Sequence, residues 1–294
     1  MARFFSFSSG ISLELSDYLS WVNDNVDEQD LDSLAASAEM LYRLTLNNSL
    51  LNDHILGPLK ASLDQVQPKN QYTDATFLLG TAKMGGLLVR ANLWKPLKAI
   101  NGSTAYEADI YSYDVPHDHN FDFLTAGYYG LGYRTDIFSY ETRDLSLVEG
   151  ESVEITHVKT MNLTPDDLIL FEKSRDIYTQ IPPKSPSISI NLLCVTNAQA
   201  LTQQCFFDID KKKLSGYANG PTSTRVQMIK MVEVIGIKDA VDLLIPIICR
   251  HPCVRTRAAA IECVLRMCPD LRSHLHSLVG HERAPLLVRA LATN

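Results

Sequence analysis

The stretch PHDHNFDF, residues Pro116–Phe123, carries the strongest chemical signal in the chain. Its histidines, His117 and His119, are two positions apart, and on an extended strand such residues point to the same face. Two imidazoles side by side suit one metal ion, and Asp122 follows three residues later as a candidate oxygen ligand. Strand-like runs precede and follow the stretch, at Tyr106–Val115 and Phe123–Gly127. We therefore expect a β-rich domain built around a metal site.

Composition and charge exclude several classes of protein. Of 294 residues, 46% are hydrophobic and 21% are charged, which is typical of a folded chain and not of a disordered one. The net charge of −7 argues against a general nucleic-acid binder. No apolar run reaches the roughly 18 residues of a membrane-spanning helix, and the N-terminus turns polar too early for a signal peptide. We expect neither a nucleic-acid nor a membrane partner.

The six cysteines indicate a compartment. They all lie in the last third of the chain, and their spacing is not that of a disulfide framework. In a chain of this size such cysteines are typical of reduced thiols. We therefore expect a cytoplasmic protein.

Residues 1–67 show helical spacing. Apolar residues recur at intervals of three and four through Leu13–Val22, Leu31–Thr45 and Leu50–Val66. The pair Gly57-Pro58 predicts a break or kink in the third of these segments. We expect an N-terminal helical segment over 1–67.

Residues 68–210 change to alternation punctuated by turn residues. Seven or eight short strands in this order favour an antiparallel sandwich or small barrel. Besides the run that ends at Val115 and the one that starts at Phe123, the strand-like runs are Ala75–Gly80, Leu87–Trp94, Tyr133–Glu141, Val153–Met161, Asp167–Glu172 and Ser187–Val195.

The last part of the chain is helical again. Residues 211–221 contain three lysines, two glycines and a proline and read as a linker. Beyond it, two similar helix openings lie roughly 30 residues apart, which is typical of a repeat array. With the VRxxAA opening at Val254–Ala259, residues 222–294 resemble a short run of HEAT-type repeats, a kind of module that offers a surface to a protein partner.

The middle of the chain, roughly residues 77–195, resembles the cupin superfamily, and within it the cysteine-dioxygenase-like branch. The HDH element at His117–His119, the glycine eight residues later (Gly127) and the SISINLL strand at Ser187–Leu193 carry the resemblance. It implies an antiparallel β-barrel that binds Fe(II), or another divalent metal, through three histidines and adds oxygen to a thiol. Two of the three histidines carry over, as His117 and His119.

The third histidine of the resembling family has no counterpart here. Tyr178 occupies its place, between the strand that ends at Glu172 and the strand that begins at Ser187. A phenol with a pKa near 10 is a poorer ligand than imidazole at neutral pH. Three alternatives follow: Tyr178 ligates or assists the metal, Asp122 or His157 completes the set, or the site is degenerate.

Three further residues are candidates for substrate binding. Arg90 alternates with apolar residues in Leu87–Trp94, so it can face the barrel interior and bind a carboxylate through two hydrogen bonds. Tyr128 and Tyr133 flank glycines and are expected at the barrel mouth.

The sequence thus predicts an α+β protein: a helical segment over 1–67, a cupin-like antiparallel β-barrel over 68–210, and a HEAT-like helical module over 222–294. The expected function is that of a mononuclear non-haem iron oxygenase acting on an amino acid, a thiol or a residue presented by a partner. One alternative is a cupin isomerase or cyclase with a histidine as general base. The other is a non-catalytic, degenerate cupin beside a repeat scaffold.

Overall fold

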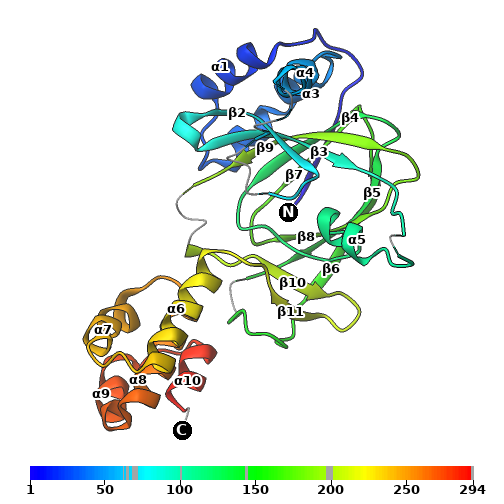
Figure 1. Cartoon of the computed structure of the whole chain (residues 1–294). Coiled ribbons are helices and arrows are strands. Elements are labelled where there is room, and N and C mark those ends of the chain that lie inside the picture. The colour runs from blue at the N-terminus through cyan, green and yellow to red at the C-terminus, as the bar shows by residue number, and fades with distance from the viewer. Residues whose placement is uncertain are drawn as a thin grey trace. The chain divides into compact units, whose positions relative to one another are not determined.

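The chain folds into two compact units (Figure 1). The computed structural model describes residues 1–61, 63, 66–67, 72–99, 101–142, 145–196 and 201–292, and only the backbone of residue 53. The first unit comprises Met1–Tyr140 and Ile155–Thr196, and the second comprises Glu141–Glu154 and Asn197–Asn294. The N-terminal helices therefore belong to the same unit as the main sheets.

The first unit contains five helices, one 3₁₀ turn and nine strands among its described residues. The helices are α1 (Leu15–Asn25), α2 (Leu31–Ala36), α3 (Ala38–Thr45), α4 (Asn52–Lys60) and α5 (Ala105–Tyr111), with the 3₁₀ turn η1 at Lys83–Gly85. The strands are β1 (Arg3–Ser6), β2 (Thr76–Ala82), β3 (Leu87–Trp94), β4 (Phe123–Tyr129), β5 (Tyr133–Tyr140), β6 (Ile155–Leu163), β7 (Asp167–Phe171), β8 (Asp176–Ile181) and β9 (Ser187–Cys194).

These strands form two antiparallel sheets. The larger has six strands in the order β1-β7-β4-β9-β3-β2, and the smaller has three in the order β6-β5-β8. The α+β class and the antiparallel pairing agree with the sequence prediction. The hydrogen-bonded ladders form two separate sheets, and a single closed barrel is not part of the observed pairing.

The central strands of the large sheet, β3, β4, β7 and β9, are buried on both faces. Because side chains alternate along a strand, Val89, Leu124 and Leu192 share one core with α1–α3, together with Tyr18 and Leu41. The opposite face packs against the small sheet and forms a second core. Members of this core are Leu88, Trp94, Phe123, Ile169, Phe171 and Leu193 of the large sheet and Tyr133, Ile137, Leu163 and Tyr178 of the small sheet. The candidate site lies in this second core.

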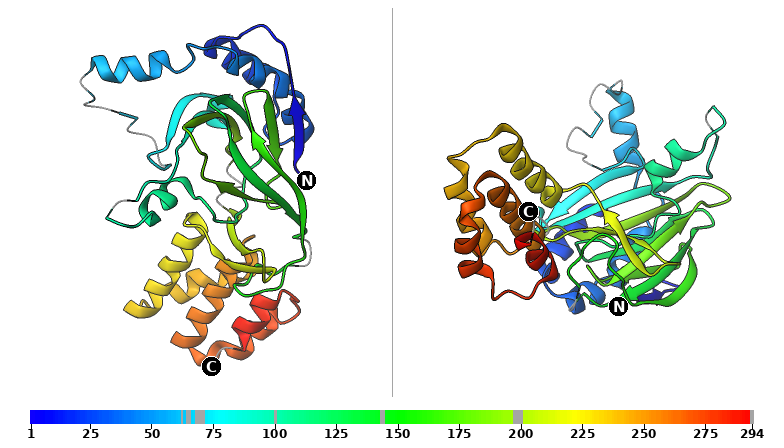
Figure 2. Two further views of the ribbon diagram at one scale, coloured as in Figure 1. Left: turned by 90° about the vertical axis from the view of Figure 1, so that its right-hand side faces the viewer. Right: turned by 90° about the horizontal axis from the view of Figure 1, so that it is seen from below.

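The second unit combines a β-hairpin with a helical array. Its elements are β10 (Cys205–Asp208), β11 (Lys213–Tyr217), α6 (Pro221–Ile235), α7 (Ala240–Arg250), α8 (Val254–Met267), the 3₁₀ turn η3 (Pro269–Leu271), α9 (Arg272–Val279) and α10 (Pro285–Leu291). Helix α8 packs against α6, α7 and α10 and so forms the centre of the array (Figure 2). The helical content of the module agrees with expectation, and its HEAT-type repeat character stays a prediction.

Two sequence expectations are wrong. The run Tyr106–Val115 is not a strand, because α5 covers Ala105–Tyr111. The Ser103 hydroxyl accepts a hydrogen bond from the Ala105 N–H at the start of this helix, and Ser112 ends it in the left-handed conformation at φ 53°. The alternation of apolar residues in this run predicts a strand, but local hydrogen bonds stabilise a helix instead.

The expected linker over 211–221 also contains structure. Strand β11 covers Lys213–Tyr217 and pairs with β10, with Leu214 buried. Helix α6 then begins at Pro221, where a proline is tolerated because the first helical N–H needs no partner. The lysines that suggested a linker lie in and beside an exposed hairpin turn.

Membrane-spanning helices and disulfides are absent from the parts of the chain that the structure describes. No helix there is long and apolar enough to cross a bilayer. All six cysteines are described, and all are free thiols.

Gly127 is a point of close backbone approach. A Cβ atom at this position would lie 2.1 Å from the backbone oxygen of Thr164. Because the clash is with the backbone, no change of side-chain rotamer can relieve it. We expect Gly127→Ala to lower the free energy of unfolding by about 2 kcal/mol. Gly57→Ala in α4 is the matched control, since nothing lies within 4 Å of its added Cβ and alanine favours the helix. Equal unfolding midpoints in urea for the two variants would contradict this packing.

Candidate active site

His117, His119 and Tyr178 meet between the two sheets. The ring centroids of His117 and His119 are 5.3 Å apart, and those of His117 and Tyr178 are 4.6 Å apart. The third side of the triangle, His119 to Tyr178, measures 5.4 Å. The structure therefore brings together His117, His119 and Tyr178, the residue that the sequence resemblance places where a third histidine is expected.

Backbone pairing fixes this arrangement. The backbone N–H of His117 donates to the Tyr178 carbonyl at 3.2 Å, and the Tyr178 N–H donates to the His117 carbonyl at 3.0 Å. The segment before β4 is thereby attached to β8, which sequence reasoning had treated as a connection between strands. All but the last residue of β8 are buried, because its side chains meet protein on both faces.

The ring of His117 is oriented by a hydrogen bond between its Nδ1 and the carbonyl oxygen of Val115, at 2.7 Å. A carbonyl only accepts, so Nδ1 carries the proton and Nε2 carries the lone pair of the neutral ring. Burial lowers the pKa of His117, and the hydrogen bond to Val115 only partly opposes this effect. A neutral imidazole with a fixed tautomer suits either a metal ligand or a general base.

Aromatic rings surround the histidine pair. The ring of His119 stacks on Phe121 at 4.3 Å and meets Phe123 edge-on at 5.2 Å. Tyr178 packs against Phe171 at 4.5 Å, and burial raises the pKa of its phenol well above the usual value. The phenol is therefore protonated at neutral pH and can donate a hydrogen bond.

Arg90 is a buried cation near this cluster. It lies on β3 in register with Asn191 of β9, which is in turn in register with Thr125 of β4. Its side chain is 7% exposed, its guanidinium lies 4.5 Å from the ring centre of Tyr72, and its Nε has no hydrogen-bond partner among the described residues. Burial lowers the pKa of Arg90, while nearby tyrosines, Tyr178 among them, partly oppose the effect. A guanidinium held this way has donors to offer an anion.

Tyr133 also belongs to this core. Its ring packs against Trp94 at 4.3 Å, and the Trp94 indole N–H donates to the Ser189 hydroxyl at 3.0 Å. Burial raises the pKa of Tyr133, and the charge of Arg90 partly opposes this effect. We use the name inter-sheet cluster for Arg90, His117, His119, Tyr133 and Tyr178.

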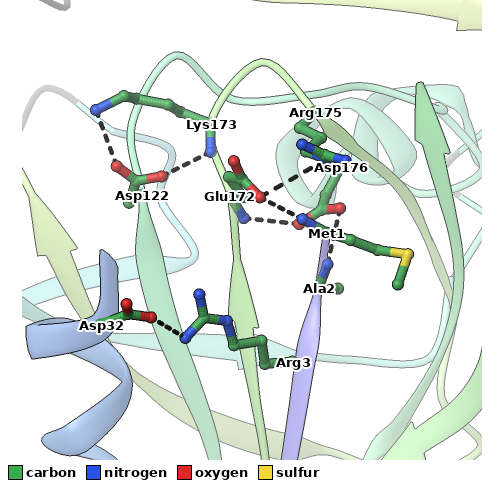
Figure 3. A network of polar contacts seen from close by, with 9 residues as sticks. All are labelled: Met1, Ala2, Arg3, Asp32, Asp122, Glu172, Lys173, Arg175 and Asp176. Atoms are coloured by element: carbon green, nitrogen blue, oxygen red, sulfur yellow. Dashed lines mark hydrogen bonds and ion pairs between the residues drawn. The ribbon is translucent and has the colours of Figure 1, made fainter. Parts of the chain in front are cut away.

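Asp122 does not join the histidines. Its Oδ1 accepts the backbone N–H of Lys173 at 2.8 Å, and its Oδ2 pairs with the Lys173 ammonium at 2.9 Å (Figure 3). Within the described parts of the chain, no three His, Cys, Asp or Glu side chains lie close enough to hold one metal ion. The predicted ligand Asp122 is therefore engaged in a structural ion pair.

Two other candidates lie outside the cluster. His157 is exposed on β6, where its Nε2 lies 3.1 Å from the Thr160 hydroxyl. Tyr128 packs with the helix-side core, and its hydroxyl donates to the Asn47 carbonyl at 3.1 Å. The expectation that Tyr128 lines the barrel mouth does not fit this placement, because alternation along β4 turns it to the other face of the sheet.

Sequence reasoning missed several polar residues of this core. Ser187, Ser189 and Asn191 are each at most 3% exposed, and they alternate with apolar residues along β9. That period of two was visible in SISINLL and could have assigned them to the inner face. Asp118 is also fully buried and accepts a hydrogen bond from the Tyr140 hydroxyl.

Comparisons with known proteins give only weak likenesses. No protein-family model matches the sequence, and no curated protein sequence matches it significantly. Among solved structures, DMSP lyase DddQ from Ruegeria pomeroyi aligns at 12% identity and a TM-score of 0.26, over 44% of this chain and 49% of the lyase.

Two further structures align to a similar extent. RmlC from Streptococcus suis, solved with dTDP-D-xylose, aligns at 10% identity and a TM-score of 0.25, over 45% of this chain and 58% of its own. A cupin 2 domain-containing protein from Halorhodospira halophila aligns at 11% identity and a TM-score of 0.26, over 49% and 76%. At these scores the alignments assign no function.

Asp176 supports the strand that carries Tyr178. Its Oδ1 accepts the Ala2 N–H at 2.9 Å and its Oδ2 accepts the Glu172 N–H at 2.7 Å (Figure 3). Burial outweighs these hydrogen bonds and raises the pKa of Asp176 from 3.8 to about 6.

Between about pH 4 and pH 6, the folded protein therefore holds a proton at Asp176 that the unfolded chain releases. We expect the free energy of unfolding to fall by about 2 kcal/mol as the pH rises through this window. Urea unfolding of wild type and Asp176→Asn across pH 4–7 measures the effect, and the variant should lose this slope. The same slope in both proteins would assign it to other groups.

Proposed function

We propose that the inter-sheet cluster is the active site of a mononuclear non-haem iron oxidoreductase that acts on a small molecule bearing a carboxylate. The observation that carries the proposal is the convergence of two imidazoles, two buried phenols and one buried guanidinium among aromatic rings. Side chains so different in chemistry are costly to bury together unless they serve a ligand.

The donor set fits iron in part. His117 and His119 supply two imidazole nitrogens, and the bond from Nδ1 to Val115 orients the first of them as a ligand through Nε2. No carboxylate or third imidazole among the described residues completes a three-ligand set. His117 and His119 would hold the iron, which would supply redox chemistry with dioxygen when bound.

The remaining residues have separate roles. Arg90 binds the carboxylate of the substrate, with the free Nε as one donor. Tyr178 donates a hydrogen bond to substrate beside the histidines, because its raised pKa keeps the phenol protonated. The rings of Phe121, Phe123 and Phe171 exclude water from the reacting atoms.

A second candidate function is supported by one specific feature. His117 is neutral at pH 7, and its ring lies 4.6 Å from that of the protonated Tyr178. A neutral imidazole and a phenol at this separation form a general base and a general acid for proton transfer in an isomerase or cyclase. Activity that persists in iron-free protein would favour this function over the oxidoreductase.

The histidine pair has a direct test. We expect protein purified without chelators to contain about one iron per chain, and His117→Ala or His119→Ala to lower the content at least tenfold. Elemental analysis by mass spectrometry gives the iron content, and urea unfolding should show a loss nearer 1 than 4 kcal/mol. His157→Ala is the control, because this exposed histidine should leave the metal content unchanged. Iron that persists in both single variants would refute the site.

The role of Tyr178 has a spectroscopic test. If Tyr178 is a hydrogen-bond donor and not a ligand, we expect the ferric protein to show no blue or purple phenolate-to-iron absorption band. We also expect Tyr178→Phe to retain the iron content of wild type. Tyr178→His should raise iron affinity, because it adds a third imidazole beside the first two. A visible band in wild type that Tyr178→Phe abolishes would instead make the phenolate a ligand.

A further inference from the structure

A cavity of about 310 Å³ lies on the helix-side face of the large sheet, opposite the inter-sheet cluster. Helix α4 forms one wall, and strands β2, β3 and β9 form the other. The residues that line the cavity include Ile55 and Leu59 of α4 and Phe77, Leu79, Ala91 and Ile188 of the sheet. Figure 2 shows α4 standing over the strands β2 and β3.

Among the described residues, the wall of this cavity offers few hydrogen-bonding groups. The polar residues among them are His54 and Gln67. The Gln67 amide is used by the backbone of β2: its Nε2 donates to the Leu78 carbonyl at 3.0 Å, and its Oε1 accepts the Leu78 N–H at 2.7 Å. His54 already has another contact. Since the described wall offers so few of the two to four partners that a buried water needs, an apolar occupant is favoured.

The mouth of the cavity exposes large apolar side chains to solvent. Ile55 is 53% exposed, Leu59 is 52% exposed and Leu63 is 54% exposed. A ligand that covers them and fills the cavity removes apolar surface from water on both walls. The helix side of the sheet therefore lacks packing that a hydrocarbon would complete.

We propose that this cavity binds one unbranched aliphatic chain of a small amphiphile, with the polar head of the ligand in water at the mouth. The volume equals that of roughly ten water molecules at about 30 Å³ each. A methylene group is of similar size, so the cavity has room for a medium fatty-acyl chain. A peptide fits less well, because its backbone groups would be buried without partners. A peptide also cannot pair as an added strand at Leu78, because the N–H and the carbonyl of Leu78 already bond to the Gln67 amide.

Calorimetric titration of the full chain with dodecanoate below its micelle concentration tests the proposal. We expect saturable binding of one ligand per chain, with affinity rising roughly threefold to fourfold per methylene from octanoate to dodecanoate. Leu59→Trp should weaken binding at least tenfold, because the larger ring fills the cavity. Leu56→Trp is the matched control: Leu56 is 47% exposed on the same helix and is not part of the cavity wall.

Two further arms define the outcomes. His117→Ala should bind dodecanoate as wild type does, because the cavity and the inter-sheet cluster lie on opposite faces of the sheet. Sedimentation with phosphatidylcholine vesicles should show no association. Absence of saturable dodecanoate binding, equal affinity in Leu59→Trp and wild type, or binding to vesicles alone would each overturn the proposal, whatever the fate of the iron site.

Discussion

The central strands of the six-stranded sheet are buried on both faces, and this constraint organises the first unit. Each of these strands must supply an apolar row toward the helix-side core and a second row toward the small sheet. In the second row, alternation places Arg90, Thr125 and Asn191 in register across three strands. Polar groups buried in this way need partners, so the same constraint that builds the core also concentrates the chemistry.

Alternation made much of this predictable from sequence. Strands β2, β3, β5, β6, β7 and β9 each overlap a run with the expected period of two, and the helices α1, α3 and α4 overlap segments with helical spacing. The run that became α5 misled because its period fits a strand, while its ends are set by Ser103 and Ser112. A periodicity argument cannot weigh such local hydrogen bonds against alternation.

The site was predictable to the extent that it is local. His117 and His119 are neighbours on one strand-like segment, and their common face follows from spacing alone. Asp122 and Tyr128 lie away from the histidines, beside the partners Lys173 and Asn47, and spacing alone does not reveal these partners because they lie far away in sequence. The sequence resemblance identified Tyr178 by its position in the chain, but its pairing with His117 depends on β8. Because β8 is buried on both faces, its sequence shows no alternation of polar and apolar residues that would predict a strand.

The path of the chain through its two units has a consequence for folding. Strand β1, at residues 3–6, pairs with β7 at residues 167–171, and the chain enters the second unit at Glu141–Glu154 before it returns to the first. Neither unit is therefore complete when only the first half of the chain has been synthesised. Such long-range pairing slows folding. During synthesis, β1 stays unpaired until β7 has emerged from the ribosome.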